Sequence, residues 1–470
     1  MSLEADSTRL AEEFRPLLRA GAPRLLADLG TLVKIPSVSW AEFDPVHVVA
    51  SANHVAKLCE ETGVFDQVGA YHHGTGAPAV LARREPAPGA PTVVLYAHHD
   101  VQPPGPDEQW ESPPYSPSVR NGRLYGRGSA DDKAGIAVHL AAIRALRDLV
   151  GSDFPLGLVM FIEGEEENGS PSFQGFLQEH TAQVQGDVIV VADSDNPSPN
   201  TPAITVSLRG NVTAVLRIRT LDHAVHSGMM GGAIPDAMMA WLVLASSFYA
   251  ADGSVAIEGL GNFPTMDSAD SMVVGEEAGL LPGVREIGKG SVADRLWRGP
   301  ALTITGIDAP KVAEASNTLI PEVRVKLSLR VAPGDSASSA EAALRTHIAQ
   351  AMPFGATWEL GDVSLGEPFV VEQGAPALDL ASAAAHAGFG ERVVYQGVGG
   401  SIPFISMLHE AFPQAQIVVT GVEDPDTRAH SPNESLDLGV LWRQALTESV
   451  LLGLLNHRSH SEILRSDSVE

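Results

Sequence analysis

The sequence predicts an α/β protein whose first domain is built on a mostly parallel β-sheet. Three apolar runs, at residues 92–96, 156–162 and 187–192, have the length of buried strands. Segments with apolar residues at helical spacing separate these runs, as expected where helices connect parallel strands. At 470 residues the chain exceeds the size of one ordinary hydrophobic core. We therefore expect two domains, one of which can interrupt the other.

Local signals place the other elements of this first domain. Helical spacing and turn residues predict helices over 7–32, 45–62 and 134–149 and a strand at 79–83. The first helix ends before Pro36, because proline disfavours helical geometry in the residue that precedes it. The first hundred residues thus alternate between helix and strand.

The pattern of the sequence changes after Arg209. Apolar and polar residues alternate from Val212 to Ile218, which predicts a strand with one exposed face. The elements expected next are a helix over 235–249, an irregular segment over 252–300, strands at 302–307 and 323–331, and a helix over 338–351. These elements predict a small α+β domain. Helices over 378–387 and 438–455 and a strand at 417–420 then follow.

Charge and composition exclude several classes of function. The chain has 31 Lys and Arg against 58 Asp and Glu, a net charge of −27. Nucleic acid and anionic membrane surfaces would repel it, so we expect neither as a partner. We find no secretory signal and no apolar run long enough for a membrane span. With Cys59 as its one cysteine, the chain is expected to be cytoplasmic and free of intramolecular disulfides.

Histidine and carboxylate side chains follow the predicted strands. His98 and Asp100 end the first strand, and their spacing points both side chains the same way on an extended backbone. That arrangement suits a metal-bound imidazole with a carboxylate behind it. Strand ends of a parallel sheet meet at one edge, where ligands bind. We expect this edge to collect His98, Asp131, Glu166, Glu167 and Asp195.

The carboxylates are more numerous than structural roles require. Asp131 and Asp132 precede a helix, where one aspartate is enough to cap the exposed amides. Four carboxylates between Glu163 and Glu167 repel one another unless a cation neutralises some of them. Histidines and carboxylates without cysteine suit Zn²⁺ or Mn²⁺. The surplus predicts two metal ions that share a bridging aspartate and a bridging water, with a free carboxylate as proton shuttle.

Six motifs stand in an order that resembles one known family. They are His98-His99-Asp100-Val101-Gln102-Pro103, Gly126-Arg127-Gly128 with Asp131-Asp132-Lys133-Ala134-Gly135, Glu163-Gly164 with Glu166-Glu167-Asn168-Gly169-Ser170, Ser194-Asp195-Asn196, His226-Ser227-Gly228 and Ala429-His430-Ser431. Over nearly the whole chain they resemble the dinuclear-zinc metallopeptidases: carnosinases, cytosolic dipeptidases, glutamate carboxypeptidases, acetylornithine deacetylases and succinyl-diaminopimelate desuccinylases. Residues 101–103 and 399–403 look most like the dipeptidase branch.

The resemblance implies a fold and an activity. The fold is a zinc-aminopeptidase-like catalytic domain with a mixed, mostly parallel sheet, interrupted by a smaller α+β lid and dimerisation domain. The catalytic domain would comprise residues 1–208 and 375–470, and the lid residues 209–374. The activity is metal-dependent hydrolysis of dipeptides or related small amides.

The resemblance also implies a role for each site residue. His98 and Asp195 would bind one divalent ion, Glu167 and His430 the other, and Asp131 would bridge the two. Two ions per chain are expected, Zn²⁺ first, with Mn²⁺ or Co²⁺ as alternatives. Two further side chains act beside the metals: Glu166 as general base, and Asp100 as the partner that orients the His98 ring.

The lid and the second part of the catalytic domain would supply the remaining groups. His226 resembles the histidine that stabilises the oxyanion in a neighbouring subunit's site, which implies a homodimer formed through the lid. Four residues resemble those that hold the C-terminal carboxylate of the substrate: Arg330, Thr318, Gly400 and Ser401. The ordinary alternatives are a loop histidine for His226 and a surface arginine at a strand exit for Arg330.

Three alternatives stay open at the level of sequence. The same site could serve an N-acyl amino-acid deacylase or a succinyl-diaminopimelate desuccinylase. A metal-free binding or scaffold protein could use the same fold. Glu165 replaces an apolar residue frequent in the family, and a slip of register would make Glu165 the base and Glu166 the ligand. His99 and His223 receive no role.

Overall fold

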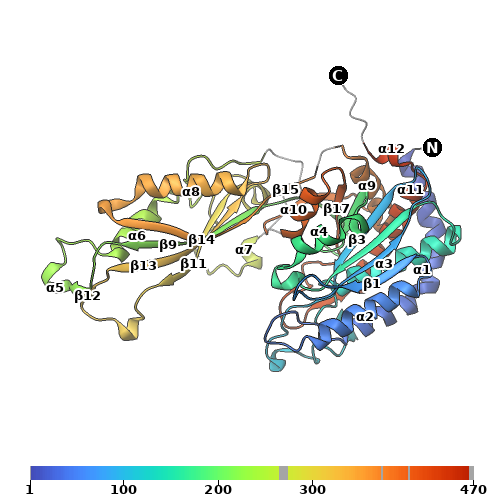
Figure 1. Cartoon of the computed structure of the whole chain (residues 1–470), viewed down its shortest axis with the longest axis horizontal. Helices are drawn as coiled ribbons and strands as arrows, with labels where there is room; N and C mark the ends of the chain where they lie inside the picture. The colour runs from blue at the N-terminus through green and yellow to red at the C-terminus, as the bar shows by residue number, and fades with distance from the viewer. Residues whose placement is uncertain (1, 264–273, 372–373, 401–402, 465–470) are drawn as a thin grey trace, which may run out of the picture. The chain divides into compact units, whose positions relative to one another are not determined.

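The computed structural model of the chain forms two compact units (Figure 1). It describes residues 2–263, 274–371, 374–400 and 403–464. Unit 1 comprises Met1–Val206, Val371–Tyr395 and Met407–Glu470, and unit 2 comprises Ser207–Val370 and Gln396–Ser406. The predicted domain boundaries, 208/209 and 374/375, lie close to the boundaries between the units, 206/207 and 370/371. Residues 396–406 were expected in the catalytic domain but belong to unit 2.

Unit 1 is organised around a nine-stranded mixed sheet. Its strand order is β1-β2-β6-β3-β7-β17-β8-β15, with β16 also paired to β8. The strands are β1 (Gln67–Tyr71), β2 (Ala79–Arg84), β3 (Thr92–His98), β6 (Gly157–Glu163), β7 (Val188–Val191), β8 (Ala203–Leu208), β15 (Phe369–Val370), β16 (Val394–Val398) and β17 (Gln416–Val419). Strand β15 and the last residues of β8 and β16 are assigned to unit 2. The four central strands β6, β3, β7 and β17 are parallel, which confirms the predicted α/β class.

Helices cover both faces of this sheet (Figure 1). Those of unit 1 are α1 (Leu3–Val33), α2 (Val46–Glu60), α3 (Lys133–Val150), α4 (Phe173–Val184), α9 (Pro376–Phe389), α10 (Pro403–Ala411), α11 (Leu438–Asn456) and α12 (His460–Ile463). Helices α1, α3, α9 and α11 pack together, and α4 packs against β2 and β6. By length and composition α11 is apolar enough to cross a membrane, but 78% of its most apolar window is buried, as in a core helix.

Short strands join distant parts of unit 1. In a three-stranded sheet, the central strand β5 (Arg123–Tyr125) pairs with β4 (Ser118–Arg120) on one side and with β18 (Ser435–Asp437) on the other. This sheet brings the segment before Asp131 beside the segment after His430. Asp131 and His430, two candidate metal ligands, therefore lie on loops that this sheet joins.

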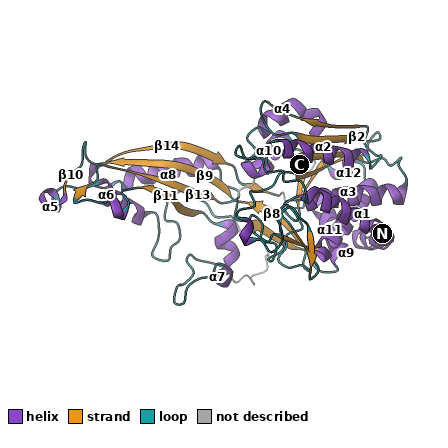
Figure 2. Cartoon of the chain, turned by 90° about the horizontal axis from the view of Figure 1, so that it is seen from below, coloured by secondary structure: helices purple, strands orange, loops and turns teal. Residues whose placement is uncertain are grey.

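Unit 2 contains a four-stranded antiparallel sheet in the order β11-β13-β9-β14. The strands, which run side by side in Figure 2, are β9 (Gly210–Arg219), β11 (Ala301–Asp308), β13 (Glu322–Val331) and β14 (Thr357–Gly366). Helices α6 (Ala237–Ser247) and α8 (Ala337–Ala351) pack on the sheet, as the α+β prediction required. Smaller elements are β10 (Val225–His226), α5 (Ser227–Met230), α7 (Val274–Glu277) and β12 (Thr318–Leu319).

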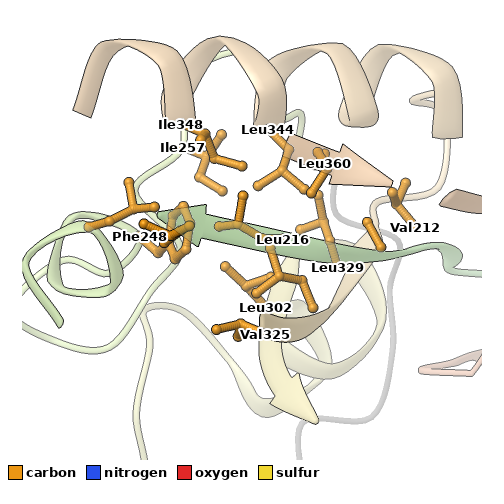
Figure 3. Close-up of a cluster of buried hydrophobic side chains, with 14 of the residues drawn as sticks. Val212, Leu216, Phe248, Ile257, Leu302, Val325, Leu329, Leu344, Ile348 and Leu360 are labelled. Atoms are coloured by element: carbon orange, nitrogen blue, oxygen red, sulfur yellow. The ribbon is translucent and has the colours of Figure 1, made fainter. Parts of the chain in front are cut away.

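The core of unit 2 follows from the alternating pattern of its strands. On β9 and β13 every second residue is buried, including Val212, Leu216, Val325 and Leu329. These side chains meet the α8 residue Leu344 and its neighbours in one apolar cluster (Figure 3). The opposite face of the sheet carries polar residues, so one layer of helices is enough to bury the core.

Candidate metal centre

The ends of the central strands bring the candidate ligands together. In the parallel pair β3 and β6, His98 lies opposite Glu163, so both strands end at the same level. Strand β7 ends at Val191, and the Ala192 amide still donates to the Tyr96 carbonyl. Side chains that follow these residues therefore enter one region at the carboxyl edge of the sheet.

Five of these residues form two groups that share Asp131. The first group is His98, Asp131 and Asp193, and the second is Asp131, Glu167 and His430. Within each group the possible ligand atoms lie within 4.8 Å of one another. His98 Nε2 is 3.1 Å from one Asp131 oxygen, and His430 Nε2 is 2.9 Å from the other. The two carboxylate oxygens of Asp131 thus face different histidines, as a bridging ligand requires.

The position of Asp193 corrects the predicted ligand set. Among the residues that the structure describes, neither group includes Asp195. Asp193 is the second residue after β7, whereas Asp195 forms an isolated bridge with Glu423. Asp193 and Asp195 are two residues apart, so on an extended chain their side chains point to the same side. The alternating pattern of the sequence therefore could not distinguish them. The observed end of β7 places Asp193 at His98.

The adjacent aspartates Asp131 and Asp132 divide two tasks. Asp132 is the N-cap of α3, and its carboxylate accepts hydrogen bonds from the Gly135 and His98 amides, at 3.2 Å and 3.3 Å. It therefore fixes both the helix start and the last residue of β3. Asp131 remains available for the two histidines.

The structure distinguishes the glutamates of the acidic run. The Glu165 carboxylate is buried and accepts from the Ala77 amide at 3.0 Å, the Ser172 amide at 2.7 Å and the Ser172 hydroxyl. These bonds commit Glu165 to the turn itself, which contradicts the alternative register. Glu167 lies in the second ligand group, 3.2 Å from His430 Nε2. Glu166 stands between them on a single helical turn at Glu166–Asn168.

Asp100 supports both a ligand and this turn. One of its oxygens lies 3.3 Å from His98 Nδ1 and accepts from the Glu166 amide at 3.2 Å. The other accepts from the Glu167 amide at 3.1 Å and the Ser39 hydroxyl at 2.7 Å. A carboxylate behind a ligating histidine fixes the orientation of its ring. The position predicted for Asp100 agrees with these contacts.

Burial and then charge repulsion raise the pKa values of three carboxylates in the site. Burial, with the Asp131 carboxylate nearby, raises the pKa of Glu167 to about 7. Burial and Asp131 also raise the pKa of Asp193 to about 6, against the opposing effect of His98. Burial and then Asp193 raise the pKa of Glu166 well above its usual range. These shifts are the expected signature of several carboxylates in a dry site.

The pKa values of the two ligand histidines are raised as well, which favours their charged form. Hydrogen bonds to Asp131 and Glu167 raise the pKa of His430 to about 11. Burial lowers the pKa of His98, but Asp100 and Asp131 outweigh it and the pKa lies well above its usual value. Hydrogen bonds from His430 and His98 hold the pKa of Asp131 below its usual range despite burial. The site therefore favours positive charge at the positions of its ligand atoms.

The donor set fits divalent metal ions. Imidazole nitrogens and carboxylate oxygens suit Zn²⁺, Mn²⁺ and Co²⁺, and each group offers three ligand residues around a shared aspartate. Protons on the histidines balance the carboxylates in the metal-free protein, and a cation would replace them. We identify the two groups as the candidate metal centre.

Several supporting residues were not predicted from the sequence. Gln102 donates to Glu167 from its amide N–H at 3.1 Å and its side chain at 2.8 Å, so it orients this ligand. His99 is buried and its Nε2 lies 2.8 Å from the Pro78 carbonyl. Glu434 accepts bonds from the loop that carries Asp131. Gln102 and Glu434 stand within or beside the quoted motifs, but their partners are distant in the sequence.

The predicted substrate residues lie in unit 2. His226 pairs with Thr318 in the small β10–β12 ladder, and its ring accepts from the Gly228 amide at 3.1 Å. Arg330 lies on β13 opposite Asn211. Gly400 follows β16, and Ser401 lies outside the described residues. The structure brings His226 and Thr318 together, and their predicted roles remain to be tested.

Comparison with known proteins agrees with the resemblance seen in the sequence. The chain is 32% identical over 436 residues to the cysteinylglycine-S-conjugate dipeptidase of Corynebacterium striatum, which covers 91% of this chain and 95% of the relative. It is 26% identical to the Cys-Gly metallodipeptidase dug1 of Schizosaccharomyces pombe, covering 87% of this chain and 91% of the relative.

Solved structures share the fold of the whole chain. The dipeptidase Dug1p from Saccharomyces cerevisiae matches with a TM-score of 0.72 and 21% identity, over 96% of this chain and 99% of that protein. Human carnosine dipeptidase 1 matches with a TM-score of 0.71 and 23% identity, over 95% and 99%. The profile of peptidase family M20/M25/M40 matches residues 94–449. The chain therefore belongs to peptidase family M20/M25/M40.

Proposed function

We propose that this protein hydrolyses dipeptides with two divalent metal ions, one in each ligand group. The observation that carries the proposal is the pair of groups around Asp131, with Glu166 next to them and not among the ligands. Zn²⁺ is the expected ion, and Mn²⁺ and Co²⁺ have compatible donor preferences. Bound ions of this kind polarise a carbonyl group and lower the pKa of water.

The protein's own residues would then handle the proton. Glu166 is the proposed general base, which takes a proton from the attacking water and delivers it to the leaving amine. Burial and Asp193 raise its pKa, and a base with a raised pKa is better matched to proton transfer near neutral pH. Asp100 holds the Glu166 amide and the His98 ring, so it links the base to a ligand.

Unit 2 offers groups for the substrate carboxylate. Burial and then the positive charge of Arg330 lower the pKa of Arg209 to about 10, which indicates that the two guanidinium groups lie near each other. Arg209 also donates to the Gly399 carbonyl at 3.0 Å, next to Gly400. Two cationic groups beside a glycine turn suit an anionic carboxylate. These observations support this role for Arg330 and Gly400, and the resemblance of the sequence extends the assignment to Thr318 and Ser401.

The names of the relatives narrow the proposed substrates. The names of the two relatives described above specify Cys-Gly or its S-conjugates as substrates, and a β-Ala-His dipeptidase of Homo sapiens is 26% identical over 77% of this chain. A succinyl-diaminopimelate desuccinylase of Methylobacterium radiotolerans matches only 42% of this chain. We therefore favour dipeptides, and Cys-Gly dipeptides first, over acylated amino acids.

Metal analysis and a substrate panel test this proposal together. Purified protein is expected to hold about two divalent ions per chain. The panel compares Cys-Gly, an S-substituted Cys-Gly and β-Ala-His with acetylornithine and succinyl-diaminopimelate, before and after chelation. Cleavage of dipeptides that is lost on chelation and restored by Zn²⁺ or Mn²⁺ is the expected result. Cleavage of the acylated compounds alone would establish a deacylase, and full activity without metal would refute the mechanism.

We also propose that the protein forms a homodimer through unit 2. Helix α6 buries Ala240, Trp241 and Leu244 against its sheet, yet Leu242 and Val243 on its other side are exposed. A helix that is apolar all round is expected to be covered on every side. A second copy of the chain, related by twofold symmetry, would present the same apolar face to it.

The dimer prediction has a direct test. Leu242 is 61% exposed, so Leu242→Glu is expected to leave unit 2 folded and to yield monomers in light scattering. Val119→Glu is the matched control, because Val119 is 60% exposed on β4 in unit 1, and it should remain dimeric. A dimeric Leu242→Glu protein would contradict the assigned interface.

Mixing two inactive variants extends this test to His226. If His226 serves the neighbouring subunit, Glu166→Gln and His226→Ala chains together regain activity, because each mixed dimer has one intact site. Random pairing predicts about a quarter of the wild-type rate. No recovery in a mixture proven to contain mixed dimers would place His226 outside the neighbouring site.

A further inference from the structure

Glu434 is a fully buried carboxylate between two loops of unit 1. One of its oxygens accepts from the Gly128 amide at 2.9 Å and from Arg127 Nη1 at 2.7 Å. The other accepts from the Ala130 amide at 3.0 Å and the Asp131 amide at 3.2 Å. The backbone carbonyl of Glu434 accepts a fifth bond, from the Gly126 amide at 3.1 Å. One side chain thus organises the whole segment that leads to Asp131.

The two loops joined in this way carry ligands of the same group. Asp131 ends the first loop, and His430 lies four residues before Glu434 on the second. Asp131 and Glu434 are 303 residues apart in the sequence. Neither loop can set the position of the other through the local chain, so the distance between these two ligands depends on contacts of this kind.

The loop of His430 also needs support for its own backbone. Arg428, His430 and Asn433 adopt left-handed conformations, with φ of 57°, 61° and 65°. Residues with a β-carbon avoid this region unless their surroundings hold them there. The Asn433 side chain accepts from the Glu111 amide at 2.8 Å and donates to the Gln109 carbonyl at 2.9 Å. Glu434 supplies the corresponding connection to the loop of Asp131.

Arg127 completes the connection. Its guanidinium is buried, and besides Glu434 it donates to the Ser431 and Pro103 carbonyls, each at 3.4 Å. It also lies over the Trp110 ring, 5.6 Å from the ring centre. Ser431 follows His430 directly. The Arg127–Glu434 ion pair therefore contacts both the loop of Asp131 and the loop of His430. Neither Arg127 nor Glu434 belongs to either of the two ligand groups.

We propose that Glu434 is a positioning residue that holds Asp131 and His430 at the separation required to bind the metal pair. The inference rests on the proposed function, since it concerns the same metal centre. A carboxylate is suited to the task because all four of its side-chain partners are N–H donors. Glutamine has the same shape but would direct an NH₂ group at some of these donors.

Metal titration of Glu434→Gln tests the proposal. Binding of Co²⁺ to the metal-free protein is followed by calorimetry and by the visible spectrum of the ion. We expect affinity to fall about 10- to 100-fold, as for other residues that support metal ligands. Saturating metal should restore kcat for a dipeptide while the metal concentration needed for half-activity stays raised. A merely structural role would not produce this shift.

Glu448→Gln is the matched control. Glu448 is as deeply buried as Glu434 and lies 2.8 Å from His139, in a pair that joins α11 to α3. Its substitution should lower the unfolding temperature and leave Co²⁺ affinity within about twofold of wild type. If Glu434→Gln loses stability to the same extent but binds Co²⁺ normally, Glu434 has only a structural role and the proposal is overturned.

A milder variant keeps the test open if Glu434→Gln does not fold. Arg127→Lys leaves the three amide bonds of Glu434 and removes the guanidinium, which donates to Glu434 through Nη1 and to the Pro103 and Ser431 carbonyls through Nη2. It should weaken Co²⁺ binding less than Glu434→Gln, but by more than Glu448→Gln. Unchanged affinity in Arg127→Lys would count against the proposal. A wild-type protein that binds no Co²⁺ would instead refute the proposed function itself.

Discussion

Replacing Glu166 with glutamine is expected to lower kcat by about 10²- to 10⁴-fold, the range typical of a lost general base. The amide cannot take the proton of water, but it keeps the size of the side chain. Glu166 belongs to neither ligand group, so metal content should stay the same. Single-turnover rates and metal analysis on the same sample would measure both effects. KM for the dipeptide should change little.

Glu165→Gln is the control that separates neighbouring glutamates. Glu165 holds the Ala77 amide and Ser172, so its loss should loosen the turn and lower the unfolding temperature. When all metal sites are filled, the kcat of Glu165→Gln should exceed the kcat of Glu166→Gln. The opposite order, with metal retained in both variants, would show that Glu165 is the base and that the register is shifted.

Removing the metal ions is expected to abolish activity and to make stability depend on pH. Glu167 and Asp193 have pKa values of about 7 and 6 in the metal-free fold, above those of unfolded glutamate and aspartate. The folded metal-free protein therefore binds protons that the unfolded chain releases near pH 4. As pH rises from about 4 to 7, these two groups lose their protons in the fold as well and destabilise it.

Two histidines affect this trend differently. Burial lowers the pKa of His99 to about 4, so the contribution of His99 to stability rises between pH 4 and 6.5 and offsets part of the loss from the two carboxylates. With a folded pKa of about 11, His430 contributes stability that is fully present below pH 6.5 and is lost as pH rises toward 11. The expected result is an unfolding temperature of the chelated protein that falls between pH 4 and 7. Bound ions replace the protons, so the stabilisation by metal should grow as pH rises over the same range. At a free metal concentration 1,000 times Kd, each site should add about 4 kcal/mol to the free energy of unfolding.

Thermal melts with and without Zn²⁺ across this range would check the expectation. A chelated protein that becomes more stable from pH 4 to 7 would show that the carboxylates do not repel one another as the structure indicates. Thr318→Ala, in unit 2, should give the same pH profile as wild type and serves as the comparison.

The strands and most candidate ligands could be predicted because their signals are local. The apolar runs that form β3, β6 and β7 are followed directly by His98, the acidic turn and Asp193. Topology alone then brings them to one edge. Asp195 was chosen from the Ser194-Asp195-Asn196 motif, and the structure places Asp193 rather than Asp195 in the first ligand group. Both aspartates follow β7 on the same side of an extended chain, so the sequence pattern could not distinguish them.

Other features depend on contacts that no local pattern reveals. Strand β14, with Gly361 and Asp362 at a register shift, was not predicted, since its alternation is broken where it passes β9. The short strand β1 was also missed, because it is half exposed at the sheet edge. Glu434 belongs to a motif region, but its role depends on donors 303 to 307 residues away in the sequence.

The central strand β17 has a consequence for the order in which the protein can be assembled. It pairs with β7 in the middle of the sheet but comes from the last segment of unit 1. A nascent chain that ends before this segment carries His98, Asp131, Glu167 and Asp193 without His430. Such a chain has an unfilled position beside β7 and an incomplete second ligand group. Hydrolytic activity is therefore expected only after nearly the whole polypeptide has been synthesised, so shortened translation products would be inert.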